Sequence, residues 1–565
     1  MRALALLLLL TSAVLLAQDK PAAGDDWERF VSGYIEGWFK LRPNAAVAAG
    51  RHEFDGQLPD LSRGGIEKSI AWLKAQKRAA ERFDAAALDD RQRFERDYLI
   101  AVVDGELFWL ETAEQPWRNP LFYSGAIDPA VYVTREYAPL DKRFQAYTKY
   151  ASNIPRLAQQ TRANLRTPLP RTFIEVARIS FGGLADYYEK DVPGVFASVK
   201  DKTLQREFRT ANASAAKALR ELDAWFQSLE KTANEDYALG EDKFKQMLWA
   251  TERVDTPLAE LRAAGERDLE RNLKALDEAC AKYAPGKSRS ECMQRMQAEK
   301  PKDGPVVAAR RQLEGLRQML IDKDIVSIPG PERAKVEEAP AYQRWNSAYI
   351  DSPGPYDKHL PSIYYIAPPD PKWSKEDQLA YIPSEPDLLF TSVHEVWPGH
   401  FLHGVHSNRA ASKFGQIFLS YAFTEGWAHY AEEMMWEAGL GNGDPAVHIG
   451  QLSNALLRNI RFVCAIGLHT GGMSVAECER LFREKGLQDP GNARQQAARG
   501  TFDPAYLNYT MGKLMIMKLR EQWTATRGGR KAWRHFHDQF LSYGGPPVPL
   551  VRRAMLVDQA GGALF

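Results

Sequence analysis

The amino-acid sequence predicts a mostly α-helical protein with one small β element. Apolar residues recur at spacings of three and four over several long segments, with charged residues between them, which is typical of helices packed on one another. The chain of 565 residues is 44% hydrophobic and 26% charged, so it can bury a large core. Its formal charge of +1 lacks the basic excess of nucleic-acid-binding proteins, and we expect no nucleic-acid partner.

The N-terminal residues have the pattern of an export signal. Arg2 supplies a positive charge, residues 3–16 are apolar apart from two hydroxyl residues, and Ala17 precedes a polar segment. This run is shorter than the roughly 20 residues of a membrane-spanning helix, so a cleaved signal peptide over residues 1–17 is favoured over an uncleaved anchor. We therefore expect a periplasmic or secreted protein with no membrane contact after cleavage.

Six segments show the helical pattern clearly. They cover residues 27–41, 91–112, 141–165, 204–232, 256–283 and 503–526. The fifth is the most regular: Leu258, Leu261, Leu269, Leu273, Leu276 and Cys280 form one apolar stripe, with Gly265 in its gap. We expect Thr256 to cap this helix and Pro257 to occupy its first turn.

Proline and glycine gather in two connecting segments. Residues 284–305 are polar and we expect a surface loop there, whereas residues 328–361 are expected to separate two halves of the chain. We assign residues 18–327 to an N-terminal helical region and residues 328–565 to a C-terminal region, the two forming one compact unit. Residues 362–367 are β-prone and bounded by prolines, which predicts a short strand or hairpin.

The four cysteines allow three pairings. Cys280 with Cys292 and Cys464 with Cys478 are the local ones, and an exported protein can oxidise them. Buried free thiols are an equally good interpretation.

The strongest functional signal is the heptapeptide from His394 to His400, His-Glu-Val-Trp-Pro-Gly-His. In the common zinc-protease motif two histidines stand four apart on one helix face, with the glutamate after the first acting as general base. Here they stand six apart, which would place them on different faces of a regular helix. Pro398 and Gly399 lie between them, and a bulge or kink there would bring His400 round to His394.

A third ligand is expected from a second helix over residues 423–433. Glu425, His429 and Glu432 share one stripe of that helix at spacings of four and three. Glu425 is the natural candidate, since zinc enzymes with two histidines and a glutamate keep a fourth position open for water. His429 and Glu432 are expected either to orient the ligands by hydrogen bonds or to be ordinary salt-bridged residues.

These two motifs, with Glu-Gly-Trp-Ala-His-Tyr-Ala-Glu from residue 425 to 432, resemble the bacterial family catalogued as domain of unknown function 885. The resemblance extends over nearly the whole mature chain, including residues 237–240, 467–469 and 509–513. That family is regarded as a group of zinc metallopeptidases, similar in helical architecture and metal motif to the gluzincin peptidases such as angiotensin-converting enzyme. The resemblance implies a large helical metallopeptidase-like fold, with the small β element near the active-site cleft.

The same resemblance implies the roles of the site residues. His394, His400 and Glu425 would bind one Zn²⁺, and Glu395 would be the general base that activates water. Tyr509 is the first candidate to stabilise the tetrahedral oxyanion and His469 the second, although both have a structural interpretation as packed, hydrogen-bonded side chains.

Several nearby residues have competing interpretations. His403 and His406 are expected to be structural, and they are the rival ligands if the bulge does not form. Arg458 and Arg461 could bind a substrate carboxylate, but a position on the helix surface is the simpler expectation. Tyr364 and Tyr365 are expected in the core, with pairing to an extended peptide as the alternative.

The sequence therefore favours an exported zinc metallopeptidase that hydrolyses peptide bonds of short peptides. The alternative is a non-catalytic periplasmic protein that binds peptides or metal on the same fold, and the retention of Glu395 argues for the enzyme. A serine hydrolase is disfavoured because no G-x-S-x-G elbow is present. Nothing in the sequence sets an oligomeric state.

Overall fold

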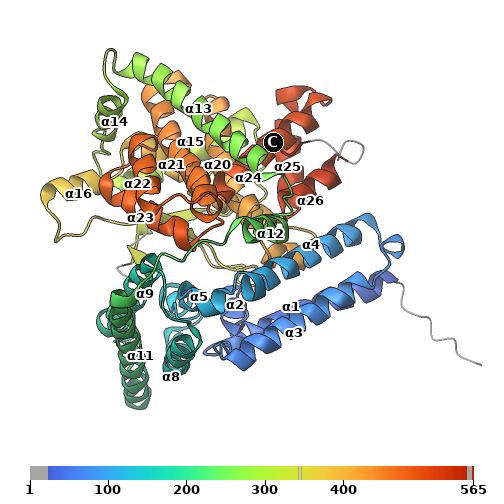
Figure 1. Cartoon of the computed structure of the whole chain (residues 1–565), viewed down its shortest axis with the longest axis vertical. Helices are drawn as coiled ribbons and strands as arrows, with labels where there is room; N and C mark the ends of the chain where they lie inside the picture. Colours follow the sequence, from blue (N-terminus) through green and yellow to red (C-terminus); the bar gives the residue numbers. More distant parts are fainter. Residues whose placement is uncertain (1–22, 341–342, 345–346, 557–562) are drawn as a thin grey trace, which may run out of the picture.

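The computed structural model describes residues 23–340, 343–344, 347–556 and 563–565, and this part of the chain is mostly helical, as the sequence predicts (Figure 1). The expected signal peptide lies outside the described residues. Among the helices described, none is long and apolar enough to span a membrane.

The N-terminal helices form two groups, each with its own apolar core. The first group holds α1 (Ala23–Leu41), α2 (Pro43–Ala48), α3 (Arg63–Glu81) and α4 (Asp90–Leu107), and α4 continues as a π-helical turn over Phe108–Thr112. The second holds α7 (Ala130–Thr134), α8 (Leu140–Asn164), α9 (Arg171–Lys190), α10 (Val192–Val195) and α11 (Lys202–Leu229). Two short helices, α5 (Gln115–Arg118) and α6 (Leu121–Ser124), lie between these groups along the chain. In Figure 1 both groups lie below the C-terminal helices.

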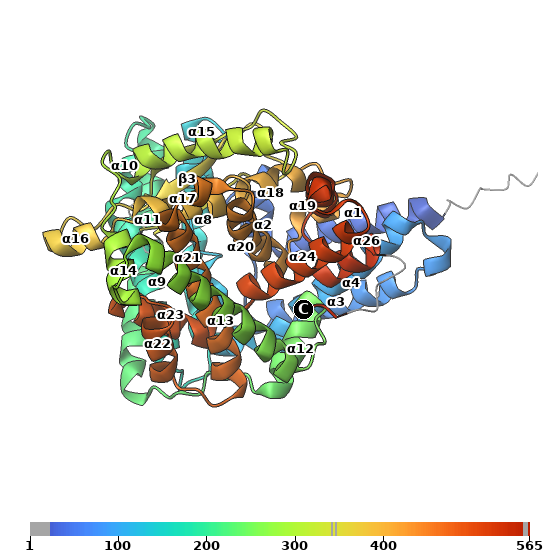
Figure 2. The same ribbon diagram turned by 90° about the horizontal axis from the view of Figure 1, so that it is seen from above.

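The largest core draws on residues from Phe108 to Leu556, and most of the remaining helices surround it. The first of them are α12 (Glu241–Glu252), α13 (Leu258–Tyr283), α14 (Arg289–Gln297), α15 (Pro305–Lys323), α16 (Lys375–Tyr381), α17 (Glu385–Glu395), α18 (His400–Ser407) and α19 (Lys413–Ile417). The others are α20 (Tyr421–Glu437), α21 (Pro445–Thr470), α22 (Val475–Glu484), α23 (Pro490–Phe502), α24 (Asn508–Ala525), α25 (Trp533–Ser542) and α26 (Val548–Met555). Helix α16 projects from the rest of the molecule (Figure 2).

A three-stranded sheet is the β element that the structure describes. Its strands are β1 (Ala334–Glu338), β2 (Ala348–Asp351) and β3 (Ser362–Ile366), in the order β1-β3-β2. Strand β3 pairs with β1 in parallel, with Ala334 opposite Ser362, and with β2 antiparallel, with Ile350 opposite Tyr364. The predicted strand is therefore present as the central strand, and the two strands beside it come from the segment that the sequence assigns to a connector.

Three local expectations are wrong. Pro257, not Thr256, is the N-cap of α13, and no side chain caps that helix. The expected loop over residues 284–305 contains α14, which Ser288 and Glu291 begin with a reciprocal capping box. The last long helix begins at Asn508, because Asp503 is the C-cap of α23 and residues 504–507 form turns.

Both local cysteine pairs are disulfide-bonded. Cys280 in α13 joins Cys292 in α14, and Cys464 in α21 joins Cys478 in α22. The structure has no free cysteine. Each bond ties two consecutive helices together, which confirms the local pairing among the alternatives.

Candidate metal centre

The helix that carries His394 ends one residue later. Val396 leaves the helical region with φ of −125° and ψ of −73°, the Trp397–Pro398 peptide bond is cis, and a new helix starts at His400. The Gly399 amide donates to the Val393 carbonyl at 2.9 Å. The interruption expected from Pro398 and Gly399 is confirmed, and it is a full break between two helices rather than a bulge within one.

Gly399 is required at this break by close backbone contact. A Cβ atom at this position would lie 1.7 Å from the His394 carbonyl oxygen and 2.5 Å from that of Val393. Any side chain here would therefore push α17 and α18 apart.

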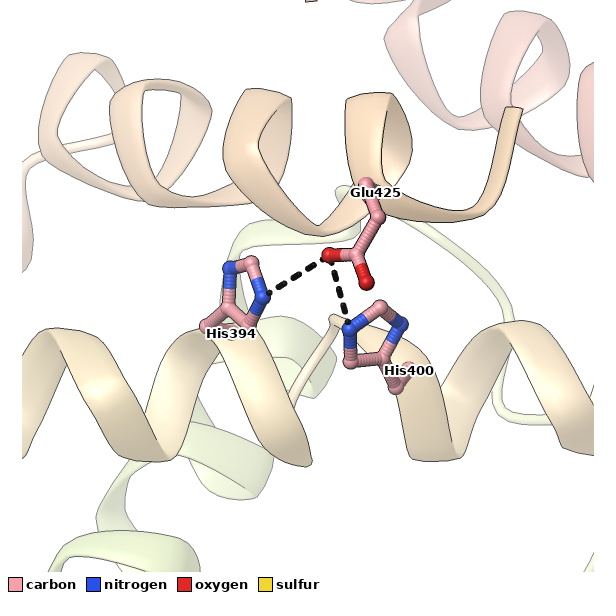
Figure 3. Close-up of side chains that lie close together, drawn as sticks. All are labelled: His394, His400 and Glu425. Atoms are coloured by element: carbon pink, nitrogen blue, oxygen red, sulfur yellow. Dashed lines mark ion pairs between the residues drawn. The ribbon is translucent and has the colours of Figure 1, made fainter. Parts of the chain in front are cut away.

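The facing helix α20 presents Glu425 to the break (Figure 3). Glu425 Oε2 lies 3.4 Å from His394 Nε2 and 3.3 Å from His400 Nε2. One ligand atom from each residue lies within 4.8 Å of the others, and this is the one such group of three among the described residues. The side chains of His394, His400 and Glu425 are 6%, 15% and 20% exposed, so the group reaches solvent on the side of His400 and Glu425.

A close crossing of α20 and α24 places Tyr509 beside this group. A Cβ on Gly426 would lie 2.5 Å from Gly512 Cα, so the two backbones touch where the glycines meet. The Tyr509 ring lies almost parallel to the His394 ring, at a centroid distance of 6.4 Å.

The donor set fits a divalent metal ion. Glu425 Oε2 is buried and has no hydrogen-bond partner among the described residues, although two imidazole nitrogens lie close to it. Burial would raise the pKa of Glu425, but His400 and His394 hold it well below its ordinary value, so the carboxylate is ionised. Two imidazoles and one carboxylate form a ligand set that suits Zn²⁺.

A buried carboxylate orients the first histidine. His394 Nδ1 lies 2.7 Å from Glu432 Oε1, a distance at which the ring N–H donates to the carboxylate and leaves Nε2 facing Glu425. Arg458 Nη2 lies 3.1 Å from the same Glu432 oxygen. Burial would raise the pKa of Glu432, but Arg458 and His394 hold it well below its ordinary range. Of the two alternatives for Glu432, the structure therefore favours the one in which it orients His394 by a hydrogen bond.

His429 is fully buried, and its Nδ1 lies 3.5 Å from the second Glu432 oxygen. Burial lowers the pKa of His429 to about 4, so its ring is neutral.

Glu395 lies against the sheet. The Ile350 amide of β2 donates to Glu395 Oε2 at 3.1 Å, and the side chain is buried. Burial raises the pKa of Glu395 above its ordinary value, and although His394 and His400 oppose the shift, the Glu425 carboxylate adds to it. A carboxylate with a raised pKa is a better proton acceptor at neutral pH.

The structure does not bring His469 to the metal group. Its Nδ1 accepts from the Leu239 amide at 3.2 Å and its Nε2 donates to the Gly500 carbonyl at 2.8 Å, so both ring nitrogens are occupied. It also lies eleven residues beyond Arg458 on α21, about 16 Å along that helix. The expectation that His469 stabilises an oxyanion is therefore replaced by its structural alternative, whereas Tyr509 remains beside His394.

Two other histidines and two tyrosines take structural positions. His403 Nε2 donates to the Gly544 carbonyl at 2.7 Å and His406 Nε2 to the Ser327 carbonyl at 2.9 Å, so neither is a rival ligand. Tyr364 and Tyr365 are buried in the central strand. Pairing of that strand with a peptide is excluded because both of its edges are already paired.

The expectation of a helix-surface position for two arginines is wrong. Arg458 and Arg461 are 7% and 8% exposed, and with Arg499 from α23 they surround the Tyr509 ring. The signal for this was present, because both stand three apart in a helix whose other positions are largely apolar. Arg499 and Tyr421, which also contacts Tyr509, carry no motif that singles them out.

Comparisons with known proteins agree with this fold. Residues 43–555 match the family model described as "Bacterial protein of unknown function (DUF885)". A structure described as "a putative lipoprotein of unknown function" from Shewanella oneidensis is 24% identical, covers 94% of this chain and 99% of its own, and superposes with a TM-score of 0.76. One described as a "putative lipoprotein" from Colwellia psychrerythraea is 17% identical, with coverages of 94% and 98% and a TM-score of 0.79. No curated protein matches the chain in sequence.

Proposed function

The chain belongs to the DUF885 family of bacterial proteins, and for this member we propose an exported zinc metallopeptidase that hydrolyses peptide bonds of short peptides. His394, His400 and Glu425 bind the metal, and Glu395 is the general base. The two motifs are similar to those of the gluzincin peptidases, and we choose peptides as the substrates by analogy with those enzymes.

The spacing of the donor atoms is the observation that carries the proposal. Two ligands about 2.0–2.1 Å from a tetrahedral Zn²⁺ stand about 3.3 Å apart. Glu425 Oε2 lies 3.4 Å and 3.3 Å from the two histidine nitrogens. These two distances match those of such a centre, and the Glu425 oxygen has no hydrogen-bond partner among the described residues.

The residues around this group have the arrangement that hydrolysis requires. Zn²⁺, when bound, supplies Lewis acidity that activates water and the peptide carbonyl. Glu395 accepts the proton of the attacking water and passes it to the leaving amine, since its raised pKa suits both transfers. Glu432 keeps His394 oriented. Tyr509, whose ring lies almost parallel to the His394 ring, is the candidate donor to the developing oxyanion.

The test separates metal binding from catalysis. Wild-type protein, Glu395→Gln and Glu425→Gln are compared for zinc content and for cleavage of a mixture of tripeptides, followed by mass spectrometry. We expect about one zinc per chain and cleavage in the wild type, the same zinc but about 10²–10⁴-fold slower cleavage in Glu395→Gln, and loss of both in Glu425→Gln. Glu385→Gln, at the exposed start of the same helix α17, is the matched control.

Two outcomes would reject parts of this proposal. A wild type that binds zinc and peptides without cleaving them would favour the non-catalytic binding protein. A wild type that binds no zinc, even when zinc is supplied, would remove the metal centre itself.

Export is part of the proposal, because three observations support it. The sequence of residues 1–17 has the pattern of a signal peptide. Both disulfide bonds suit an oxidising compartment. The solved structures with this fold are described as putative lipoproteins. Cell fractionation, together with the N-terminal sequence of the mature protein, tests it: material confined to the cytoplasm with residues 1–17 intact would refute export.

A further inference from the structure

Arg461 is a buried cation without a counter-ion. Its side chain is 8% exposed, and no carboxylate of the described residues forms an ion pair with it. Its one hydrogen bond runs from Nε to Gln496 Oε1 at 2.9 Å, so both Nη groups lack an acceptor in this part of the chain. An unpaired buried charge is costly, and a ligand that supplies the missing negative charge would remove that cost.

The neighbouring arginines are paired, which isolates the unpaired charge at Arg461. Arg458 lies 3.1 Å from Glu432 Oε1, and Arg499 lies 2.9 Å from Asp503 Oδ2. The three guanidinium groups therefore pair with only two carboxylates among the described residues, and one positive charge is not neutralised. Burial lowers the pKa of Arg461, with Arg499 adding to the effect, as expected where like charges lie close and no anion is present.

Tyr509 connects this charge to the metal group. The Arg461 guanidinium lies 4.9 Å from the centroid of the Tyr509 ring, and that ring lies 6.4 Å from the His394 ring. Together these two distances limit the separation between the guanidinium and the His394 ring to about 11 Å, which is the span of about three extended residues. Part of that span is taken up by the metal and by the contact with the guanidinium, which leaves one or two residues of peptide.

We propose that Arg461 binds the free C-terminal carboxylate of the peptide substrate, one or two residues beyond the bond that is cleaved. The guanidinium fork matches a carboxylate in a two-point hydrogen bond, and a single negative charge neutralises the single excess positive charge. This inference rests on the proposed function, and it makes the enzyme an exopeptidase acting at the C-terminal end.

The experiment compares tripeptide mixtures that differ in the C-terminus alone. One mixture has free C-terminal acids, the second has the same sequences as C-terminal amides, and the third has amides that contain Asp or Glu side chains. Binding to the zinc-free protein is measured by equilibrium dialysis with mass spectrometry, and cleavage is measured with the zinc-loaded protein.

The variants are Arg461→Gln, Arg461→Lys and, as a control, Arg480→Gln. The last removes the same charge from an exposed position on α22 that forms no ion pair with any residue that the structure describes. Arg461→Gln is expected to fold, because it removes an unpaired buried charge. Its circular dichroism spectrum and thermal midpoint check this, and Arg461→Lys keeps the charge while removing the fork.

In the wild type and Arg480→Gln we expect the acids to bind about 30-fold more tightly than the amides, and to be cleaved preferentially by the same factor. In Arg461→Gln this preference disappears, and in Arg461→Lys it is partly kept. Equal binding of acids and amides by the wild type, or an unchanged preference in Arg461→Gln, would overturn the assignment. Binding of the acidic-side-chain amides as tightly as the acids would also overturn it.

Failure of this inference is distinguishable from failure of the proposed function. Cleavage of acids and amides at equal rates would refute the carboxylate site and leave the peptidase intact. The opposite result is that nothing is cleaved, but the zinc-free wild type binds acids more tightly than amides and Arg461→Gln does not. That result would refute the peptidase and leave the carboxylate site intact.

Discussion

Replacing Gly399 by alanine tests whether the break between α17 and α18 builds the metal centre. The added Cβ would lie 1.7 Å from the His394 carbonyl oxygen, where folded proteins keep at least 3.0 Å, so the two atoms must separate by about 1.3 Å. One partner of this contact is the backbone of His394 itself, and the other is Gly399, which directly precedes His400. The clash therefore moves the two ligands relative to each other, with few other routes for relief.

The magnitude follows from the tolerance of metal coordination. Ligand distances in zinc sites hold within about 0.2 Å, so a shift of about 1.3 Å loses one ligand. We expect zinc affinity to fall at least about 100-fold and the free energy of unfolding to fall by about 1–3 kcal/mol, as for other overpacked sites. Competition with a chromogenic chelator measures the first quantity and denaturant unfolding the second.

Gly404→Ala is the matched control. Gly404 lies on the same helix α18, and an added Cβ there would meet nothing within 4 Å. Alanine is the better helix former, so this variant should keep its zinc and be slightly more stable. If Gly399→Ala bound zinc within threefold of the wild type and unfolded with the same free energy, the steric argument would be refuted.

Two further predictions concern buried charges outside the metal centre. Burial raises the pKa of Glu252 to about 7, so the folded protein holds a proton that the unfolded chain releases above about pH 4.5. Stability should therefore fall by about 3 kcal/mol between pH 4.5 and 7, and Glu252→Gln should abolish this slope in denaturant titrations; an unchanged slope would contradict it. Lys513→Met removes the buried cation that pairs with Asp268 and Glu433, so the free energy of unfolding should fall by about 3–5 kcal/mol. Lys518→Met is the control on the same helix, because Lys518 forms no ion pair among the described residues, and it should change the free energy of unfolding by less than about 0.5 kcal/mol.

The long helices could be predicted because their signal is local. In α13 the apolar stripe repeats every three or four residues, and the helix ends at Tyr283 as expected. Helix α14 is only nine residues long, with Cys292, Met293 and Met296 as its buried positions, too short a pattern to outweigh its polar composition. Strands β1 and β2 owe their place to pairing with β3, which no local pattern records.

By itself, the sequence predicted which three residues the fold brings together. Residue types and spacing named His394, His400 and Glu425, and Pro398 with Gly399 gave the reason that an irregular spacing could still form one group. The break between His394 and His400 depends on residues a few positions apart, whose geometry the backbone fixes, whereas Glu425, 25 positions beyond His400, was assigned from its residue type and from the family resemblance.

Only the tertiary structure decided what surrounds that group. Glu432 lies 38 positions from His394 and Arg458 lies 64, so their contacts depend on how α17, α20 and α21 pack. The same packing buried Arg461 without a counter-ion and placed His469 outside the group. The helix that packs against a polar side chain decides whether that side chain contacts solvent, a carboxylate or a ligand. The sequence of one helix does not specify which other helix packs against it.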